Sequence, residues 1–129
     1  MAATDALLTT SALRAFYGDA QALFGVDVAL HKGEVVAVIG ANGAGKSTLL
    51  KCLTGLVKAP REAVRWRGES IGGLPPGDIV RRGIAMVPEG RRLFTGMSVL
   101  ENLEVGSYLA AAKAQRKQSL EAAIELFPV

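Results

Sequence analysis

The sequence predicts an α/β fold in which helices cover a parallel β-sheet, with a patch of antiparallel β-structure ahead of it. Residues 35–39 (VVAVI) form an apolar run bounded by Gly33 and Gly40, too short for a helix and typical of a strand buried on both faces. A glycine-rich loop follows at residues 40–47, and a helix-forming segment follows at 48–53. The order of strand, loop and helix predicts a phosphate-binding unit.

Two segments ahead of this unit predict the antiparallel patch. Residues 8–17 and 23–30 are short, partly alternating in hydropathy, and separated by the turn-forming pair Gly18-Asp19. Downstream, the expected elements are a half-exposed strand at 63–67, a short helix at 78–82, a buried strand at 84–87, a helix that starts with the capping box Ser98 to Glu101 and runs to Gly106, and a last helix at 110–126.

Composition limits the class of protein. The chain has 129 residues, of which 50% are hydrophobic and 21% charged, so we expect a globular domain with a real core. No apolar stretch approaches the ~20 residues of a membrane span, and the N-terminus lacks a secretory signal, which favours a cytoplasmic location. Cys52 is the single cysteine and His31 the single histidine; we expect the first in the core and the second on the surface.

The net charge of +3 and the pI near 9.3 raise the question of nucleic-acid binding. Most of the arginines are spread over residues 61–67, 81–82 and 91–92, and Trp66 is the one aromatic residue interleaved among them. This distribution favours a solvated or partner-facing surface, and no nucleic-acid partner is expected.

The loop at 40–47 fits the pattern G-x-x-x-x-G-K-[ST]. Its backbone N–H groups, from Gly43 to Lys46, can turn inward onto an anion, and the first turn of the following helix adds its own unpaired N–H groups. Lys46 is placed to reach the β- and γ-phosphates of a nucleotide, and the hydroxyl of Ser47 to complete a Mg²⁺ shell. The alternative is an accidental glycine-rich turn before a helix.

Tyr17 and Glu89 are further candidates. Tyr17 lies 29 residues before Lys46, beside a turn, where its ring can stack on a purine; the alternative is an aromatic residue that packs on the sheet. Glu89 follows the expected strand 84–87, and ligands bind at the carboxyl edge of such sheets. The alternative for Glu89 is a plain surface loop.

Three stretches resemble the N-terminal half of an ATP-binding cassette (ABC) transporter ATPase subunit: YGDAQALFGVDVAL at 17–30, GANGAGKST at 40–48, and GLPPGDIVRRGIAMVPEGRRLFTGMSVLENLEVG at 73–106. The phrase VPEGRRLF, with glutamate where the family usually has glutamine, resembles the branched-chain amino-acid importers in particular. The resemblance implies a P-loop NTPase fold, ATP and Mg²⁺ as cofactors, adenine stacking by Tyr17, and a catalytic role for Lys46 and Glu89, with Ser47 and Glu89 at the metal. The implied ATP-binding residues are Tyr17, Gly40, Asn42, Gly43, Ala44, Gly45, Lys46, Ser47 and Thr48.

The family pattern continues with an LSGGQ-like signature, a strand ending in Asp-Glu (Walker B) and a switch histidine, none of which occurs in this sequence. We therefore expect residues 1–129 to be the N-terminal part of a single ABC ATPase domain, truncated before the Walker B strand. Ala63 stands where the family has a glycine, and Gly68 comes one residue early, so the 60–68 hairpin is expected to be shortened or distorted.

The resemblance implies an ATP hydrolase that couples ATP binding and hydrolysis to import of branched-chain or hydrophobic amino acids. Its expected partners are transmembrane permease subunits, which hold it at the inner face of the membrane, and a second ATPase subunit. The chain alone is expected to bind Mg·ATP weakly and to turn it over negligibly. The alternatives are a non-catalytic nucleotide-binding module and a fragment without independent activity. A GTPase is disfavoured because Asn-Lys-x-Asp and Asp-x-x-Gly are absent.

Overall fold

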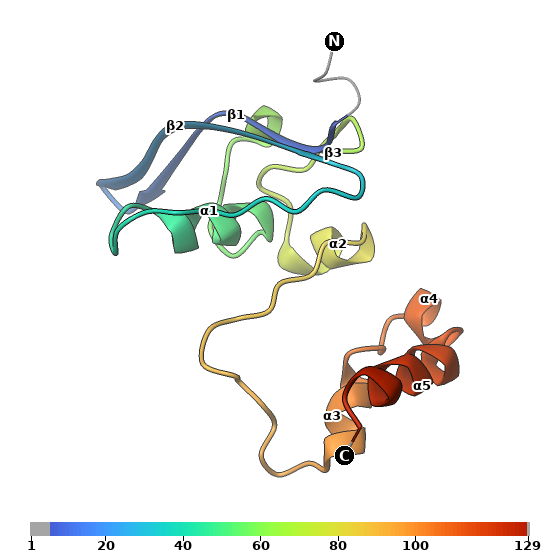
Figure 1. Ribbon diagram of the computed structural model, residues 1–129. Coiled ribbons are helices and arrows are strands. Elements are labelled where there is room, and N and C mark those ends of the chain that lie inside the picture. Colours follow the sequence, from blue (N-terminus) through green and yellow to red (C-terminus); the bar gives the residue numbers. More distant parts are fainter. Residues whose placement is uncertain (1–5, 129) are drawn as a thin grey trace. The chain divides into compact units, whose positions relative to one another are not determined.

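The computed structural model describes residues 6–128, which fall into two compact units that meet in sequence between Met86 and Val87 (Figure 1). The first unit contains β1 (Ala6–Tyr17), β2 (Ala20–His31), α1 (Lys46–Leu53), a 3₁₀ turn (Arg61–Ala63), β3 (Val64–Trp66), β4 (Glu69–Ser70) and α2 (Pro76–Arg81). The second contains α3 (Val99–Val105), α4 (Ala110–Lys113) and α5 (Arg116–Leu126). None of the helices within residues 6–128 combines the length and hydropathy that a membrane span requires.

The sheet of the first unit is antiparallel, with strand order β2-β1-β3-β4. β1 and β2 form a long hairpin across the two-residue turn Gly18-Asp19, so the predicted antiparallel patch is confirmed. Alternate apolar residues of β2, namely Val26, Val28 and Leu30, pack against the core, as the alternation in the sequence predicts.

An irregularity in β1 bends this hairpin. The ladder shifts register between Thr10 and Leu13, and Ala12 has a φ of 46°. The Thr10 hydroxyl replaces the lost ladder bonds, because it donates to the Val26 carbonyl at 2.9 Å and accepts from the Val28 N–H at 2.9 Å. The Ala12 N–H donates to Asp27 Oδ1 at 2.6 Å. The result is a satisfied β-bulge, which bends and twists a strand.

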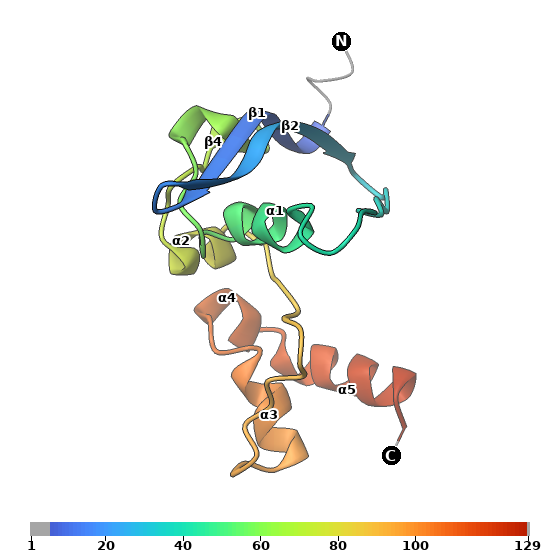
Figure 2. The same ribbon diagram turned by 90° about the vertical axis from the view of Figure 1, so that its left-hand side faces the viewer.

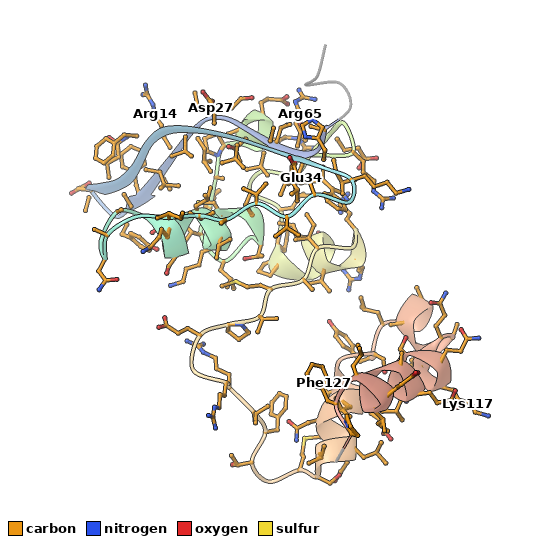
Figure 3. The ribbon with its side chains drawn as sticks, in the orientation of Figure 1. Arg14, Asp27, Glu34, Arg65, Lys117 and Phe127 are labelled. Carbon is orange, nitrogen blue, oxygen red and sulfur yellow. The ribbon has the colours of Figure 1, made fainter. Side chains whose placement is uncertain are left out.

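Helix α1 lies along one face of the β1–β2 hairpin in both views (Figures 1 and 2). It buries Thr48, Leu49, Cys52 and Leu53. These residues join a core cluster whose other members are Leu8, Leu13, Ala15, Leu23, Ala59, Ala63, Val64 and Ile71. Arg14 and Asp27 lie on the opposite, outer face of the hairpin (Figure 3). The expected core position of Cys52 is confirmed, and burial raises the pKa of its thiol.

The β3–β4 hairpin is tight rather than irregular. Its two-residue turn, Arg67-Gly68, has φ values of 50° and 84°, the pair of positive angles that a type I′ turn requires. Trp66 Nε1 donates to the Arg82 carbonyl at 2.9 Å. The Arg67 guanidinium carbon lies 5.2 Å from the centroid of the Trp66 ring, within the range of a cation–π contact. The expected distortion of the 60–68 hairpin is therefore not found, since the hairpin closes through a well-supported two-residue turn.

The prediction of parallel strands at 35–39 and 84–87 is wrong for this structure. Neither segment is in a strand, and all strand pairs within residues 6–128 are antiparallel. Val35 is 96% exposed and Ile39 is 91% exposed, whereas the sequence predicts burial on both faces. The physical reason is that a strand exists only through hydrogen bonds to a neighbour, and the described residues supply no partner for these two segments.

In the second unit the predicted capping box is confirmed. The Ser98 hydroxyl accepts from the Glu101 N–H at 3.1 Å, and Glu101 Oε1 accepts from the Ser98 N–H at 3.0 Å. The prediction of one helix over 110–126 is wrong, because the chain turns at residues 114–115 between α4 and α5. Arg116, just after the turn, donates to the Ser107 hydroxyl at 2.7 Å and to the Glu104 and Ser107 carbonyls at 3.4 and 3.2 Å. These carbonyls lie at the end of α3, so Arg116 caps that helix.

Candidate functional site

The glycine-rich loop closes against β2 at its last glycine. Gly45 is the N-cap of α1 and has a φ of 101°, which L side chains rarely adopt. A Cβ on Gly45 would lie 2.8 Å from Leu23 Cδ2 and 3.2 Å from the Ala22 carbonyl oxygen. Gly43 also has a positive φ, 87°, but its Cβ would meet nothing within 4 Å. Glycine at position 45 therefore allows both the turn and the close approach of α1 to the hairpin.

The first turn of α1 presents unpaired N–H groups. The first N–H of the helix to return to the backbone is that of Leu49, which donates to the Gly45 carbonyl at 2.9 Å. No side chain caps this end, so the N–H groups of Lys46, Ser47 and Thr48 have no acceptor within the helix. Together with the helix dipole they form an electropositive end suited to an anion.

Lys46 turns back over the loop instead of extending into solvent. Its Nζ donates to the carbonyl of Gly40, the first residue of the loop. Within the loop the Ala44 N–H donates to the Ala41 carbonyl at 3.1 Å. The ammonium group is thereby held beside the loop backbone, where an incoming anion would compete with a single carbonyl for it.

A pocket of about 400 Å³ lies between this loop and the hairpin. Its lining residues are Tyr17, Gln21, Ala22, Phe24, Asn42, Gly43, Gly45, Lys46, Ser47 and Thr48. Seven of the residues predicted to bind nucleotide are thus brought together, and among these described lining residues only Lys46 carries a formal charge. The volume lies in the range of small-molecule sites.

Some predicted residues lie elsewhere, and others were missed. Gly40 and Ala44 do not line the pocket but hold the loop through the two hydrogen bonds described above. Gln21, Ala22 and Phe24 line the pocket but were not predicted as site residues. A usable signal exists, because a two-residue turn pairs Tyr17 with Ala20, so the residues just after the turn must lie beside Tyr17.

Tyr17 is anchored at its hydroxyl. It is the last residue of β1 and is 49% exposed. Its Oη lies 3.1 Å from Thr48 Oγ1 in the first turn of α1, 31 residues away in sequence. This half-exposed position at the pocket leaves the Tyr17 ring accessible to a ligand.

Glu89 belongs to the second unit and does not line this pocket. It is exposed, in a turn with Gly90, and its backbone carbonyl accepts from Arg92 Nε at 3.3 Å. Among the described residues no group of three or more His, Cys, Asp or Glu side chains could hold a metal ion. Of the two expected metal ligands, Ser47 is the one at the pocket.

His31 was expected on the surface. Its side chain is 39% exposed, and its Nδ1 lies 3.2 Å from Glu34 Oε2. The His31 N–H donates to the same carboxylate oxygen at 2.8 Å. These two bonds, the backbone one foremost, lower the pKa of the Glu34 carboxyl. His31 therefore closes the turn after β2 and lies outside the pocket lining.

The chain resembles known proteins over nearly its whole length. A family model described as ABC transporter matches residues 23–128. The high-affinity branched-chain amino acid transport ATP-binding protein BraG of Pseudomonas aeruginosa is 44% identical over 122 residues, which are 95% of this chain and 52% of BraG. A probable branched-chain amino acid transport ATP-binding protein, LivF of Archaeoglobus fulgidus, is 38% identical and covers 95% of this chain and 51% of its own.

Solved structures agree with these relatives. The ADP conformation of MJ1267, an ATP-binding cassette of an ABC transporter, superposes with a TM-score of 0.67 at 35% identity, over 78% of this chain and 40% of that one. The protein cbiO1 of Clostridium perfringens, part of the ABC transporter complex cbiONQ, gives a TM-score of 0.71 at 25% identity, over 94% and 50%. These likenesses support the P-loop NTPase fold.

The chain spans about half the length of the curated relatives it matches. The family match nevertheless includes the glycine-rich loop, α1 and the helices of the second unit. The family match also agrees with the geometry of the site, where the glycine-rich loop, the unpaired N–H groups of α1 and Lys46 lie at one pocket. On this evidence the chain belongs to the ABC transporter family, whose members carry an ATP-binding cassette.

Proposed function

We propose that this chain is the N-terminal part of an ATP-binding subunit that couples ATP hydrolysis to import of branched-chain or other hydrophobic amino acids. The observation that supports ATP as the ligand is the pocket, in which unpaired N–H groups, the Lys46 ammonium and the Tyr17 ring are brought together. The names of BraG and LivF support the solute class. Part of that support is the extent of the match, 95% of this chain in both cases.

The proposed roles in holding ATP fall to the loop, the start of α1 and Tyr17. The N–H groups at the start of α1 and of Gly43 and Gly45 would bind phosphate oxygens, and Lys46 would leave the Gly40 carbonyl for the β- and γ-phosphates. Tyr17 would stack on the adenine. Asn42, Ala44 and Thr48 complete the proposed set with the loop glycines. The fit is one of chemistry, because the pocket offers donors and one cation to a polyanion.

Mg²⁺ fits the same donor set. This ion usually keeps several waters and takes only one or two protein ligands beside the phosphates, so the Ser47 hydroxyl at the pocket is a sufficient local donor. We assign the Glu89 carboxylate as the second protein group near the metal and the attacking water. The ion supplies charge neutralisation on the transferring phosphoryl group. Lys46 contributes to the same charge stabilisation, and the N–H groups fix the orientation of the phosphates.

The domain in this proposal is completed by polypeptide beyond the described residues. Residues 1–129 would be the N-terminal part of one ABC ATPase domain, with a parallel core sheet cut before its Walker B strand. What supports this is the exposure of apolar residues in the segments 35–39 and 84–87, since Val35, Ile39 and Val87 are each more than 90% exposed. Segments of this composition are stable as strands only with neighbours on both sides.

The partners follow from the same proposal. A subunit of this kind would work at the inner face of the cell membrane on transmembrane permease subunits, paired with a second ATPase subunit. The presence of cbiO1 in the complex cbiONQ is one precedent for assembly of a similar cassette with other chains. No nucleic-acid partner is proposed.

Titration of the 1–129 chain with Mg·ATP tests the nucleotide assignment. We expect weak binding that falls about tenfold or more in Lys46→Ala, because hydrogen bonds to charged groups contribute roughly 1.5–3 kcal/mol. Lys51→Ala is the matched control, since Lys51 lies on the same helix and does not line the pocket. Equal affinities in the wild type and Lys46→Ala would contradict the assignment.

A nucleotide-binding module without turnover is the second candidate. It is favoured by the fact that the first unit alone forms the pocket, while the sequence lacks an apolar strand ending in Asp-Glu. Phosphate release from ATP separates the two functions. For the isolated chain we expect negligible turnover; a turnover that disappears in Lys46→Ala would show that these residues suffice for catalysis.

A further inference from the structure

We infer that Thr48 is a positioning residue for Tyr17, holding the aromatic ring at the pocket through a hydrogen bond between the two hydroxyl groups. This inference rests on the proposed function, in which the ring receives the base of the nucleotide. The inference is based on the distance of 3.1 Å between Tyr17 Oη and Thr48 Oγ1. It joins the tip of the β1–β2 hairpin to the first turn of α1, and both residues line the pocket.

The two side chains differ in how firmly the fold holds them. Thr48 is 7% exposed, and its branched Cβ restricts its rotamers in a helix. Tyr17 is 49% exposed and is followed at once by the Gly18-Asp19 turn, so packing alone leaves its ring free to change rotamer. The buried threonine is therefore the fixed partner, and the hydrogen bond to it restricts the rotamers of the Tyr17 ring.

The hydrogen-bonding capacity of threonine makes two roles compatible. A hydroxyl group has one donor and two acceptor positions. When Tyr17 Oη donates to Thr48 Oγ1, the Thr48 proton remains available for a phosphate oxygen. If Thr48 Oγ1 were the donor instead, its proton would be bonded to Tyr17 Oη and could not be donated to phosphate. We therefore assign Tyr17 as the donor in the nucleotide-bound state, where a chain of hydrogen bonds from Tyr17 through Thr48 to a phosphate oxygen would strengthen each of its bonds.

The consequence is that the ring is oriented before the base arrives. Fixing a side chain in advance improves affinity by removing an ordering cost from binding. The benefit applies to a ligand that has a base and not to one that consists of phosphates alone. The ratio of ATP affinity to inorganic triphosphate affinity therefore measures the positioning role, while triphosphate binding by itself measures the phosphate loop.

The test is a double-mutant cycle on the 1–129 chain, with Mg·ATP and inorganic triphosphate as ligands. In Tyr17→Phe we expect the ATP-to-triphosphate affinity ratio to fall about fivefold, the size of one typical net hydrogen bond. In a Thr48→Val background the same change should alter the ratio by less than about twofold, because the partner is already gone. Thr48→Ser restores the hydroxyl and should restore most of the Tyr17→Phe effect.

Tyr108→Phe is the matched control, since Tyr108 is an exposed tyrosine of the second unit. Urea unfolding followed by Trp66 fluorescence shows whether each variant is folded. A Tyr17→Phe effect of equal size in the Thr48→Val background would overturn the inference. An ATP-to-triphosphate ratio that Tyr17→Phe leaves unchanged, in a chain whose ATP binding still depends on Lys46, would also overturn it. The proposed function would stand in both cases. If the wild type bound neither ligand, the proposed function would fail and the inference with it.

Discussion

Substitution of Gly45 by alanine tests how the glycine-rich loop is held against the sheet. An alanine at a φ of 101° carries backbone strain of about 1–3 kcal/mol. Its Cβ would also lie 2.8 Å from Leu23 Cδ2, and Leu23 is only 3% exposed. The leucine therefore has little room to move, and overpacking adds about 1–3 kcal/mol. We expect Gly45→Ala to lower the free energy of unfolding of the first unit by about 3–4 kcal/mol.

Gly43→Ala separates the two contributions, because Gly43 has a φ of 87° but open space around its Cβ. It should lose only the strain, about 1–2 kcal/mol. Urea unfolding measured by fluorescence of Trp66, the single tryptophan, reports on the same unit. The difference between the two variants is the cost of moving α1 away from β2. Equal losses, within about 0.5 kcal/mol, would refute the close approach as the reason for glycine at position 45.

Two further predictions use the same chain. Gly72→Ala drives a Cβ into the Pro60 carbonyl oxygen and should cost about 3 kcal/mol or more in urea unfolding. Gly77→Ala, in α2, is the control and should stabilise by about 0.5–1 kcal/mol. A Gly72→Ala chain as stable as the wild type would contradict this expectation. The Ser98 N–H holds the pKa of the Glu101 carboxyl below its usual 4.5, so its contribution to α3 is present above about pH 4.5 and is lost as the pH falls through the lowered pKa. Circular dichroism should show less helix loss on acidification in Glu101→Gln, and an identical acid profile would count against the capping box as the cause.

Local features of the fold were predictable because they depend on residues close in sequence. The capping box joins Ser98 to Glu101, three residues apart, and each side chain satisfies the backbone of the other. The turn at Gly18-Asp19 and the start of α1 are local in the same sense. The pattern of glycines, lysine and serine at 40–47 likewise predicted a loop that ends in a helix, and the structure has that loop.

Features that depend on distant partners were less predictable. Residues 35–39 have the composition of a buried strand, but composition does not supply the neighbour that a strand must bond to, and the segment is exposed. The break between α4 and α5 accompanies contacts of Arg116 with residues of the α3 end, which helical periodicity within 110–126 does not encode.

The sequence by itself determined which loop forms the candidate site, since the type and spacing of residues 40–48 predict a phosphate-binding loop. It also proposed Tyr17 as a contact, although not the way the ring is held. Only the tertiary structure decided that Gln21 and Phe24 complete the pocket and that the Tyr17 hydroxyl meets Thr48. The physical reason is that a bulged hairpin and a helix meet there across 31 residues of chain, and such a contact depends on packing between elements rather than on the local preference of either one.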